Sequence, residues 1–212
     1  AEQGMAEPQS ILASMYYEGR GVSQDYSKSE KWYRLAAEQG AAESQENLAM
    51  MYINGHGVSK NMSKAAKWTR LAAEQGMVRS QMNLGIFYHE GIGVAQDYSE
   101  SAKWHRLAAE QGLAESQNFL AKMYNTGRGV SKNPSKAAKW ALLAAEQGMV
   151  DAQLFIGISY RLGQGVVQNY SEAKKWLRRS SVQGNADARS VLAGMYQLGI
   201  GVEKNISMAY ML

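Results

Sequence analysis

Small and apolar residues recur along this chain with the spacing of one face of an α-helix. One stripe with i, i+3, i+4 and i+7 spacing consists of Gln45, Leu48, Ala49 and Tyr52. A second stripe follows it and consists of Ala65, Trp68 and Ala72. Because a polar and Gly-containing segment separates the two stripes, this part of the chain is predicted to form two consecutive helices.

The pair of stripes repeats along the whole chain with a constant period. Successive Trp residues are 36 positions apart, and they account for all five in the sequence: Trp32, Trp68, Trp104, Trp140 and Trp176. An uninterrupted period of this length indicates a repeat array. The predicted repeats are about 5–40, 41–76, 77–112, 113–148, 149–184 and a truncated 185–212. Residues 1–4 match the tail of a preceding copy, so we expect one array over 1–212 that is an excerpt of a longer one.

Each predicted second helix has recognisable ends. Short side-chain acceptors suited to an N-cap precede it: Asp25, Asn61, Asp97, Asn133, Asn169 and Asn205. Glycines suited to a left-handed residue follow it: Gly40, Gly76, Gly112, Gly148 and Gly184. Gly-x-Gly pairs such as Gly55 and Gly57 stand between the two helices and are interpreted as turns, because a phosphate-binding loop follows a strand and occurs once. Gly85 and Gly157 replace Ala within first helices and predict tight helix crossings.

These residues together resemble a known repeat family. The segment "AESQENLAMMYINGHGVSKNMSKAAKWTRLAAEQG" is similar to the Sel1-like repeat, with its small residue and Gln, Leu-Ala, Tyr, Gly-x-Gly-Val, Ala-x-x-Trp and Ala-Ala-x-x-Gly. The resemblance implies an all-α fold, a right-handed αα-repeat solenoid or superhelix related to tetratricopeptide arrays. It also implies an adaptor or scaffold in protein complexes, and some bacterial relatives are implicated in secretion, polysaccharide export or immunity. A cysteine-rich branch staples its helix pairs with disulfides, and this chain has no Cys.

Composition narrows the possible partners. No apolar run approaches the roughly 20 residues that a membrane helix needs, so we expect no membrane span. The net charge of +4 comes largely from Lys and Arg on second helices. Three interpretations of that basic stripe remain: a solvated outer face, a surface for an acidic partner, or a nucleic-acid surface. Glu residues interrupt the stripe and no exposed aromatic ladder accompanies it, so nucleic acid is the least favoured. The location, bacterial cytoplasm or periplasm, stays open.

The sequence offers no arrangement typical of an enzyme. The three histidines, His56, His89 and His105, occupy three different repeat positions, and none forms an i, i+4 pair. Glu38, Glu74, Glu110 and Glu146 recur in identical surroundings, as surface residues do. We therefore expect no catalytic residue, no metal, no cofactor and no small-molecule substrate.

Repeat positions that differ between copies are available for recognition, because the shared positions are needed for stacking. The first helix carries a variable stripe opposite its buried one, and in related αα arrays this helix lines the concave face. The predicted partner-binding residues are Asn47, Met50, Met82, Asn83, Ile86, Phe119, Lys122, Leu154, Phe155, Ile158 and Leu162. The amides would hold an extended peptide and the apolar residues would seat its side chains. Alternatively, some of the apolar residues belong to the core between repeats.

Two functions fit this surface. One is a non-catalytic scaffold or adaptor that binds a protein or peptide segment along the concave face. The alternative is a bacterial immunity or inhibitor protein that blocks a toxic effector enzyme. Such a protein would use a larger surface, including the variable residues within the Gly-x-Gly turns.

Overall fold

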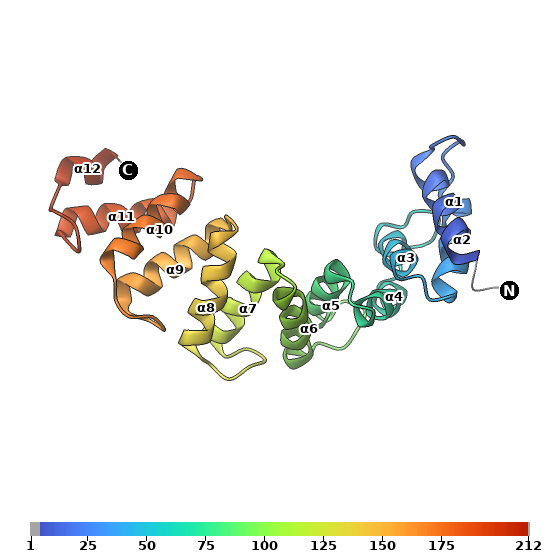
Figure 1. Cartoon of the computed structure of the whole chain (residues 1–212), viewed down its shortest axis with the longest axis horizontal. Coiled ribbons are helices and arrows are strands. Elements are labelled where there is room, and N and C mark those ends of the chain that lie inside the picture. The colour runs from blue at the N-terminus through green and yellow to red at the C-terminus, as the bar shows by residue number, and fades with distance from the viewer. Residues whose placement is uncertain (1–4, 212) are drawn as a thin grey trace. The chain divides into compact units, whose positions relative to one another are not determined.

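The computed structural model describes residues 5–211, and over them α-helices joined by turns and short loops are the main secondary structure. The first helices of the successive repeats are α1 (Ala6–Glu18), α3 (Ala42–Asn54), α5 (Val78–Glu90), α7 (Ala114–Thr126), α9 (Val150–Leu162) and α11 (Ala186–Leu198). The second helices are α2 (Tyr26–Glu38), α4 (Met62–Glu74), α6 (Tyr98–Glu110), α8 (Pro134–Glu146), α10 (Tyr170–Val182) and α12 (Ile206–Met211). The predicted all-α repeat fold is confirmed, as Figure 1 shows.

The chain divides into two compact units, Ala1–Ala108 and Ala109–Leu212, which we call the N-terminal and the C-terminal unit. Within each unit, helices that follow one another along the chain pack together. The core of the N-terminal unit contains Leu48, Met51 and Leu84, and that of the C-terminal unit contains Ile156 and Leu177. Each core therefore lies between consecutive helix pairs, as the repeat pattern predicts.

Side-chain caps fix where the second helices begin. A side-chain oxygen of Asp25 accepts a hydrogen bond of 2.9 Å from the backbone N–H of Lys28, and Asn61 does the same for Lys64. These bonds satisfy a helical N–H group that has no partner within its own helix. Second helices such as α2 and α4 are followed by a left-handed glycine, with φ of +93° at Gly40. The cap signals in the sequence are thus confirmed.

Gly-x-Gly turns at Gly57, Gly93 and Gly165 lie against the backbone of the preceding repeat. Gly55 ends α3 in the left-handed conformation, with φ of +78°. Gly57 also has a positive φ, and a Cβ there would overlap the backbone carbonyl of Tyr26. These glycines therefore serve the helix-to-helix turn, which agrees with their interpretation from sequence.

Glycines within first helices accommodate a large side chain on the following helix. A Cβ at Gly157 would lie 2.8 Å from Cγ of Leu177, and one at Gly85 would lie 2.7 Å from the His105 ring. In the intervening repeat, the equivalent pair is Ala121 and Ala141. The predicted tight crossings are confirmed at Gly85 and Gly157, where the facing side chain occupies the space that a Cβ would fill.

The repeated Trp residues belong to the packed interior or its border. Trp104 and Trp176 are buried, whereas Trp32, Trp68 and Trp140 are half-buried against core clusters. Lysine ammonium groups lie over some of the rings, for example Lys175 at 5.3 Å from the centre of the Trp176 ring. These lysine side chains cover aromatic surface with their aliphatic stems and keep their ammonium groups in water, as long cationic side chains do.

A chain of amide side chains links consecutive repeats. Gln45 on α3 donates a 3.1 Å hydrogen bond to the carbonyl of Ala37 on α2, and it accepts one of 2.8 Å from Gln75 after α4. We call this arrangement the amide junction. It recurs in the C-terminal unit around Gln117 and Gln153. The recurring Gln of the sequence is therefore a buried connector with its hydrogen-bonding groups satisfied.

Candidate binding surface

The eleven predicted partner-binding residues differ in exposure. Four are exposed: Asn47, Met50, Lys122 and Leu162. Seven are half-buried: Met82, Asn83, Ile86, Phe119, Leu154, Phe155 and Ile158. The residues of this set thus lie at the surface or at its border with the core. A role in recognition remains a prediction for all of them.

Three of the half-buried residues pack against core clusters of the C-terminal unit. Leu154 and Ile158 on α9 contact the cluster that includes Leu177 and Leu192. Phe155 borders the two clusters centred on α7 to α9. These contacts give all three side chains a packing role, which is the alternative that the sequence left open. Leu162, one turn beyond Ile158, is 52% exposed.

First helices of neighbouring repeats lie side by side and join their variable stripes into one surface within each unit. Hydroxyl oxygens of Ser10 and Ser44 are 2.6 Å apart, which links α1 to α3. In the C-terminal unit, the Lys122 ammonium group lies 3.2 Å from the Asp151 carboxylate, which links α7 to α9. We call the surface formed by α1, α3 and α5 the N-terminal first-helix surface.

A pocket of 200 Å³ opens on the N-terminal first-helix surface. Its lining consists of Tyr17, Tyr33, Asn47, Met50 and Asn54. Asn47, Met50 and Asn54 are exposed, whereas Tyr33 is buried to 5% exposure and forms part of the core behind them. The pocket thus combines two amide groups and a thioether at its rim with aromatic surface behind. We call it the tyrosine–asparagine pocket.

An aromatic cluster supports the tyrosine–asparagine pocket. The Tyr17 hydroxyl lies 2.9 Å from Nδ1 of His56, and the His56 ring stacks on Tyr26 with 4.7 Å between ring centres. Tyr26 in turn meets Tyr17 edge to face at 5.1 Å. Such mutual contacts fix the Tyr17 ring in one orientation. The His56 position of the turn therefore serves to hold the wall of the pocket.

The surroundings of the pocket carry negative charge. The pKa of Tyr33 is raised to about 12, first by burial and then by smaller effects of the Glu18 carboxylate, Tyr17 and the Glu43 carboxylate, against the opposing effect of Arg20. Burial, and then Tyr26, likewise raises the pKa of Tyr17. Both hydroxyls remain protonated at neutral pH and can donate hydrogen bonds. The pocket therefore suits an uncharged or cationic group rather than an anion.

The sequence analysis missed Tyr17 and Tyr33 as lining residues. Both stand beside a residue of the repeated pattern, Tyr16 and Trp32 respectively, and neither recurs as Tyr in the following repeat. A Tyr at a position whose residue varies among the other repeats, such as Ile53 and Asn125 for Tyr17, or Thr69 and Leu177 for Tyr33, is the signal that marks them. This signal is present in the sequence. The crossing of the helices, which the sequence does not show, decides which wall of a helix pair such a residue lines.

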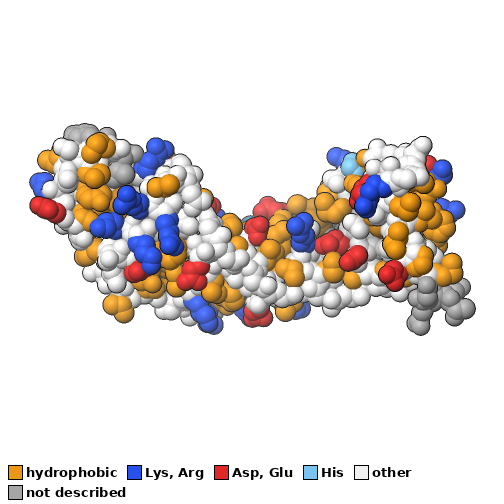
Figure 2. Space-filling view, turned by 45° about the horizontal axis from the view of Figure 1, so that its top comes forward, with side chains coloured by type: hydrophobic (Ala, Val, Ile, Leu, Met, Phe, Trp, Pro, Cys, Tyr) orange, Lys and Arg blue, Asp and Glu red, His pale blue; other side chains and the backbone are white. Residues whose placement is uncertain are grey.

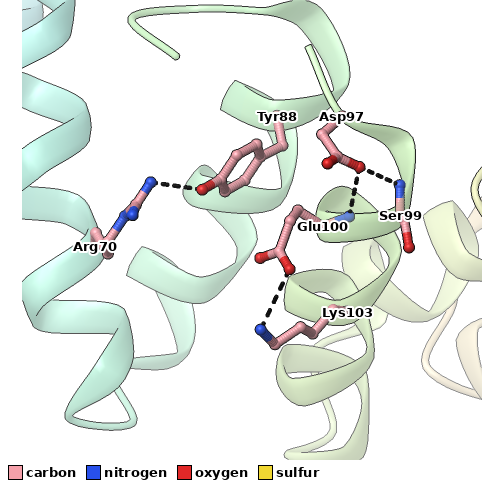
Figure 3. A network of polar contacts seen from close by, with 6 residues as sticks. All are labelled: Arg70, Tyr88, Asp97, Ser99, Glu100 and Lys103. Atoms are coloured by element: carbon pink, nitrogen blue, oxygen red, sulfur yellow. Dashed lines mark hydrogen bonds and ion pairs between the residues drawn. The ribbon is translucent and has the colours of Figure 1, made fainter. Parts of the chain in front are cut away.

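Second helices carry a different chemistry. In the N-terminal unit their charges enter local contacts, as Figure 3 shows: Arg70 donates a 2.5 Å hydrogen bond to the Tyr88 hydroxyl, and Lys103 lies 3.3 Å from Glu100. Asp97 caps the start of α6 through the backbone N–H groups of Ser99 and Glu100. Figure 2 shows Lys and Arg gathered over the left-hand part of the molecule, where Figure 1 places α8 to α11.

The histidines take part in three separate local contacts. His56 belongs to the aromatic cluster, and His89 bonds through Nδ1 to the Glu90 carboxylate at 2.7 Å. His105 is buried against Gly85, and burial, with a smaller effect of His89, lowers its pKa to about 4. Over the described residues, no group of three His, Cys, Asp or Glu side chains is arranged to hold a metal ion. None of the described helices has the length and apolar character needed to cross a bilayer.

Comparison with known proteins identifies the repeats. The family model described as "Sel1 repeat" matches residues 9–40, 42–77, 78–113, 114–149, 150–185 and 186–212. Comparison with curated proteins gave no match.

Solved structures give the same result. A protective antigen of uropathogenic Escherichia coli, c5321, with an SLR fold matches with a TM-score of 0.89 and 37% identity over 100% of this chain. The match covers 45% of that antigen's chain, so this chain spans less than half of its length. A Sel1 repeat protein from Oxalobacter formigenes matches with a TM-score of 0.76 and 37% identity, over 99% of this chain and 84% of its own. An immunity protein from Pseudomonas aeruginosa has 20% identity and a TM-score of 0.46, over 98% of this chain and 79% of its own.

Proposed function

Because the chain belongs to the Sel1 repeat family, whose members generally mediate protein–protein interactions and are generally non-catalytic, we propose that it is a non-catalytic interaction scaffold. Its partner is an extended segment of another protein, bound across the N-terminal first-helix surface. The observation that carries the proposal is the tyrosine–asparagine pocket, where Asn47 and Met50 meet the Tyr17 and Tyr33 side chains.

The chemistry of the pocket favours a peptide backbone with one anchoring side chain. The amides of Asn47 and Asn54 each offer donors and an acceptor, which match the N–H and C=O groups of an extended chain. Met50 is unbranched and polarizable, and it adapts to side chains of different shape. A volume of 200 Å³ accommodates one side chain, and the nearby Glu18 and Glu43 carboxylates favour a basic one.

Members of the predicted binding set on α5 extend this surface, and others lie separately on first helices of the C-terminal unit. Met82, Asn83 and Ile86 lie half-buried on α5, the next first helix, and continue the path of the peptide. In the C-terminal unit, Lys122 and Leu162 are exposed on first helices and offer further contacts. Phe119, Leu154, Phe155 and Ile158 contribute the apolar border of the surface there.

Site-specific photo-crosslinking in the native host tests the proposal. A photoreactive phenylalanine analogue replaces Met50 on the proposed surface, and in a parallel protein it replaces Lys67, which is exposed on second helix α4. We expect one host protein to be crosslinked from position 50 and not from position 67. Crosslinking of the same protein from position 67 alone would move the site to the second helices and contradict the proposal.

The crosslinked protein then serves as the ligand in a binding measurement. Asn47→Ala combined with Met50→Glu should weaken its binding by at least about tenfold, because both contacts at the pocket rim are lost. Both side chains are exposed, so the unfolding free energy should change by no more than about 0.5 kcal/mol. Unchanged affinity in this variant would exclude the pocket as the binding site.

A further inference from the structure

A second pocket lies in the C-terminal unit, on the side of the second helices. It has a volume of 710 Å³ and lies between the end of α8 and the last turns of α10. Ala145 and Glu146 line it from α8, and Lys175, Arg178, Arg179 and Val182 line it from α10. Gln153 and Gln183 complete the lining and belong to the amide junction of this repeat. We call it the arginine groove, and we propose that it binds an acidic segment of a partner protein.

The floor of the arginine groove is rigid. Gln183 donates a 2.8 Å hydrogen bond to the side-chain oxygen of Gln153, and the side-chain nitrogen of Gln153 donates a 3.2 Å bond to the carbonyl of Ala145. Gln153 is only 4% exposed. The buried connection holds the ends of α8 and α10 at a fixed separation, so the groove exists before a ligand binds. Such preorganisation lowers the entropic cost of binding.

The charge of the groove results from two departures from the repeat pattern. At the position of Arg179, the other repeats have Leu35, Leu71, Leu107 and Leu143. At the position of Val182, they have Glu38, Glu74, Glu110 and Glu146. This repeat therefore gains one positive charge and loses one negative charge at a single place on the surface.

The molecule contains the matching groove without these departures. Next to α1 and α2, a pocket is lined by Met5, Gln9, Leu35, Glu38 and Gln39. Gln9 and Gln39 are equivalent to Gln153 and Gln183, and they too are hydrogen-bonded to each other, at 2.7 Å. The two grooves thus have the same amide floor, while Leu35 and Glu38 stand where the arginine groove has Arg179 and Val182.

The arginines of the groove are available to a ligand. Among the described residues, neither Arg178 nor Arg179 has a carboxylate within ion-pair distance. The Arg179 guanidinium lies 4.8 Å from the centre of the Trp176 ring, which orients it and leaves its N–H groups exposed at the edge. Lys175 is already paired with Glu172 at 3.0 Å. The charge offered to a ligand therefore comes mainly from two guanidinium forks, the geometry that binds carboxylates through paired hydrogen bonds.

The remaining lining distinguishes an acidic peptide from other anions. Val182 is 80% exposed beside the arginines and offers an apolar contact that phosphate cannot use. Glu146 lines the same groove and repels any anion next to it, so a ligand must space its negative charges, which a continuous row of phosphates cannot do. Trp176 is only 3% exposed, so it cannot stack on nucleic-acid bases. A segment with spaced carboxylates around one apolar side chain complements all of these features.

A defined peptide tests the groove in the intact chain. The probe is a fluorescein-labelled peptide of Glu and Gly around one Leu, and the comparison peptide has Gln in place of Glu. Fluorescence anisotropy should give an affinity at least about tenfold higher for the Glu peptide, and a decrease of that affinity as salt is added. No binding of the Glu peptide, or equal binding of the two peptides, would overturn the proposal.

A variant that restores the common repeat residues provides the structural test. Arg179→Leu combined with Val182→Glu restores the two residue types that line the groove at α1 and α2, and it should bind the Glu peptide at least about tenfold more weakly with an unchanged melting temperature. Lys67→Glu changes the net charge by the same amount on α4 and should leave the affinity within about twofold. Equal losses in both variants would assign the binding to net charge and overturn the site. Tighter binding of oligo-dT than of the Glu peptide, or displacement of the peptide by inorganic phosphate, would also reject it.

This site is independent of the tyrosine–asparagine pocket. The groove lies on α8 and α10, whereas the pocket lies on α1 to α3. Asn47→Ala combined with Met50→Glu should therefore leave binding of the Glu peptide unchanged. The affinity of that variant for a crosslinked host protein tests only the scaffold proposal.

Discussion

The N-terminal and C-terminal units are built from the same repeat, yet they differ in the chemistry that they present. Both have the amide junction, the capped second helices and the buried Trp. The N-terminal unit contains all three histidines and the tyrosine–asparagine pocket with its acidic surroundings. The C-terminal unit has apolar packing at α9 and the arginine groove. The common positions therefore fix the backbone, and the variable ones set the surface chemistry that each unit presents.

The two units also differ in the residues that pack at the crossing of a first and a second helix. At the crossing of a first and a second helix, the N-terminal unit pairs Gly85 with His105, and the C-terminal unit pairs Gly157 with Leu177. Both pairs fit because the loss of a Cβ makes room for the larger partner. The two crossings therefore differ in their response to acid, because the His105 side chain can take up a proton and the Leu177 side chain cannot.

Removal of a buried Trp should have the largest effect in both units. We expect Trp104→Ala and Trp176→Ala each to lower the unfolding free energy by about 3–5 kcal/mol, because each leaves a cavity in a buried cluster. Urea denaturation followed by circular dichroism measures this. A change below about 1 kcal/mol would show that the Trp does not contribute to the core.

Replacement by Phe sharpens the comparison of the two Trp residues. The Trp176 indole N–H donates a 3.0 Å hydrogen bond to Glu172, whereas the buried Trp104 indole N–H has no hydrogen-bond partner in the described part of the chain. Trp176→Phe should therefore cost about 1 kcal/mol more than Trp104→Phe.

Acid should weaken the N-terminal unit first. The ordinary pKa of His is 6.5, and burial lowers that of His105 to about 4. Below pH 6.5 the unfolded chain binds a proton that the folded unit accepts only near pH 4, so stability is complete above pH 6.5 and falls between these values. The expected loss is about 3 kcal/mol by pH 4. Hydrogen exchange measured separately for α6 and α10 should show protection factors, corrected for the intrinsic effect of pH on amide exchange, that fall at α6 alone.

His105→Leu is the matched control for the acid effect, because Leu177 already occupies the equivalent position opposite a glycine. This variant should lose the pH dependence of the protection factors at α6 between pH 6.5 and 4. If α6 in the variant is as sensitive to acid as α6 in the natural chain, the sensitivity comes from groups other than His105.

Gly157→Ala should destabilise the C-terminal unit by about 1–3 kcal/mol, because its Cβ would approach Leu177. Gly194→Ala on α11 has no atom within 4 Å of the added group, and it should stabilise the chain by up to about 1 kcal/mol through helix propensity. Thermal melts of the two variants measure the difference. Combining Gly157→Ala with Leu177→Ala reproduces the Ala121 and Ala141 pair and should cost less than the sum of the single changes.

The smallest effect is expected at the surface of α9. Leu162→Glu should change the unfolding free energy by no more than about 0.5 kcal/mol, since that side chain is 52% exposed. Ile158→Glu, one turn earlier, places a charge against the cluster of Leu177 and Leu192 and should cost several times as much. Equal melting temperatures would show that Ile158 is as free as Leu162 to contact a partner.

Much of the fold could be predicted from the sequence because its determinants are local. Asn61 caps the helix that begins one residue later, and Gly55 ends the helix before it. The 36-residue period then applies the same local rules at each copy, and it also places the equivalent Trp and Gln in register. The expectation of one array over 1–212 that continues a longer one stays a prediction.

The candidate binding residues were harder to predict because their exposure depends on distances between helices. Ile158 and Leu162 are both apolar and lie on one stripe of α9, but only the position of the following repeat makes Ile158 half-buried. Asn118, another variable residue of the first helices, is buried at 7% exposure. Tyr33 lines its pocket from a second helix, which the search for variable residues on first helices did not include.

The amide junction has a consequence for how genes of this kind change length. Gln45 bonds to the carbonyl of Ala37 as Gln81 bonds to that of Ala73, with distances of 3.1 and 3.2 Å. If recombination within the coding sequence removed residues 41–76, Gln81 would stand where Gln45 stands now. It could then donate the equivalent hydrogen bond to the Ala37 carbonyl, and the remaining helices would pack through the same type of contact. Loss or duplication of a whole repeat thus preserves this contact between the remaining repeats, while it shortens or lengthens the array.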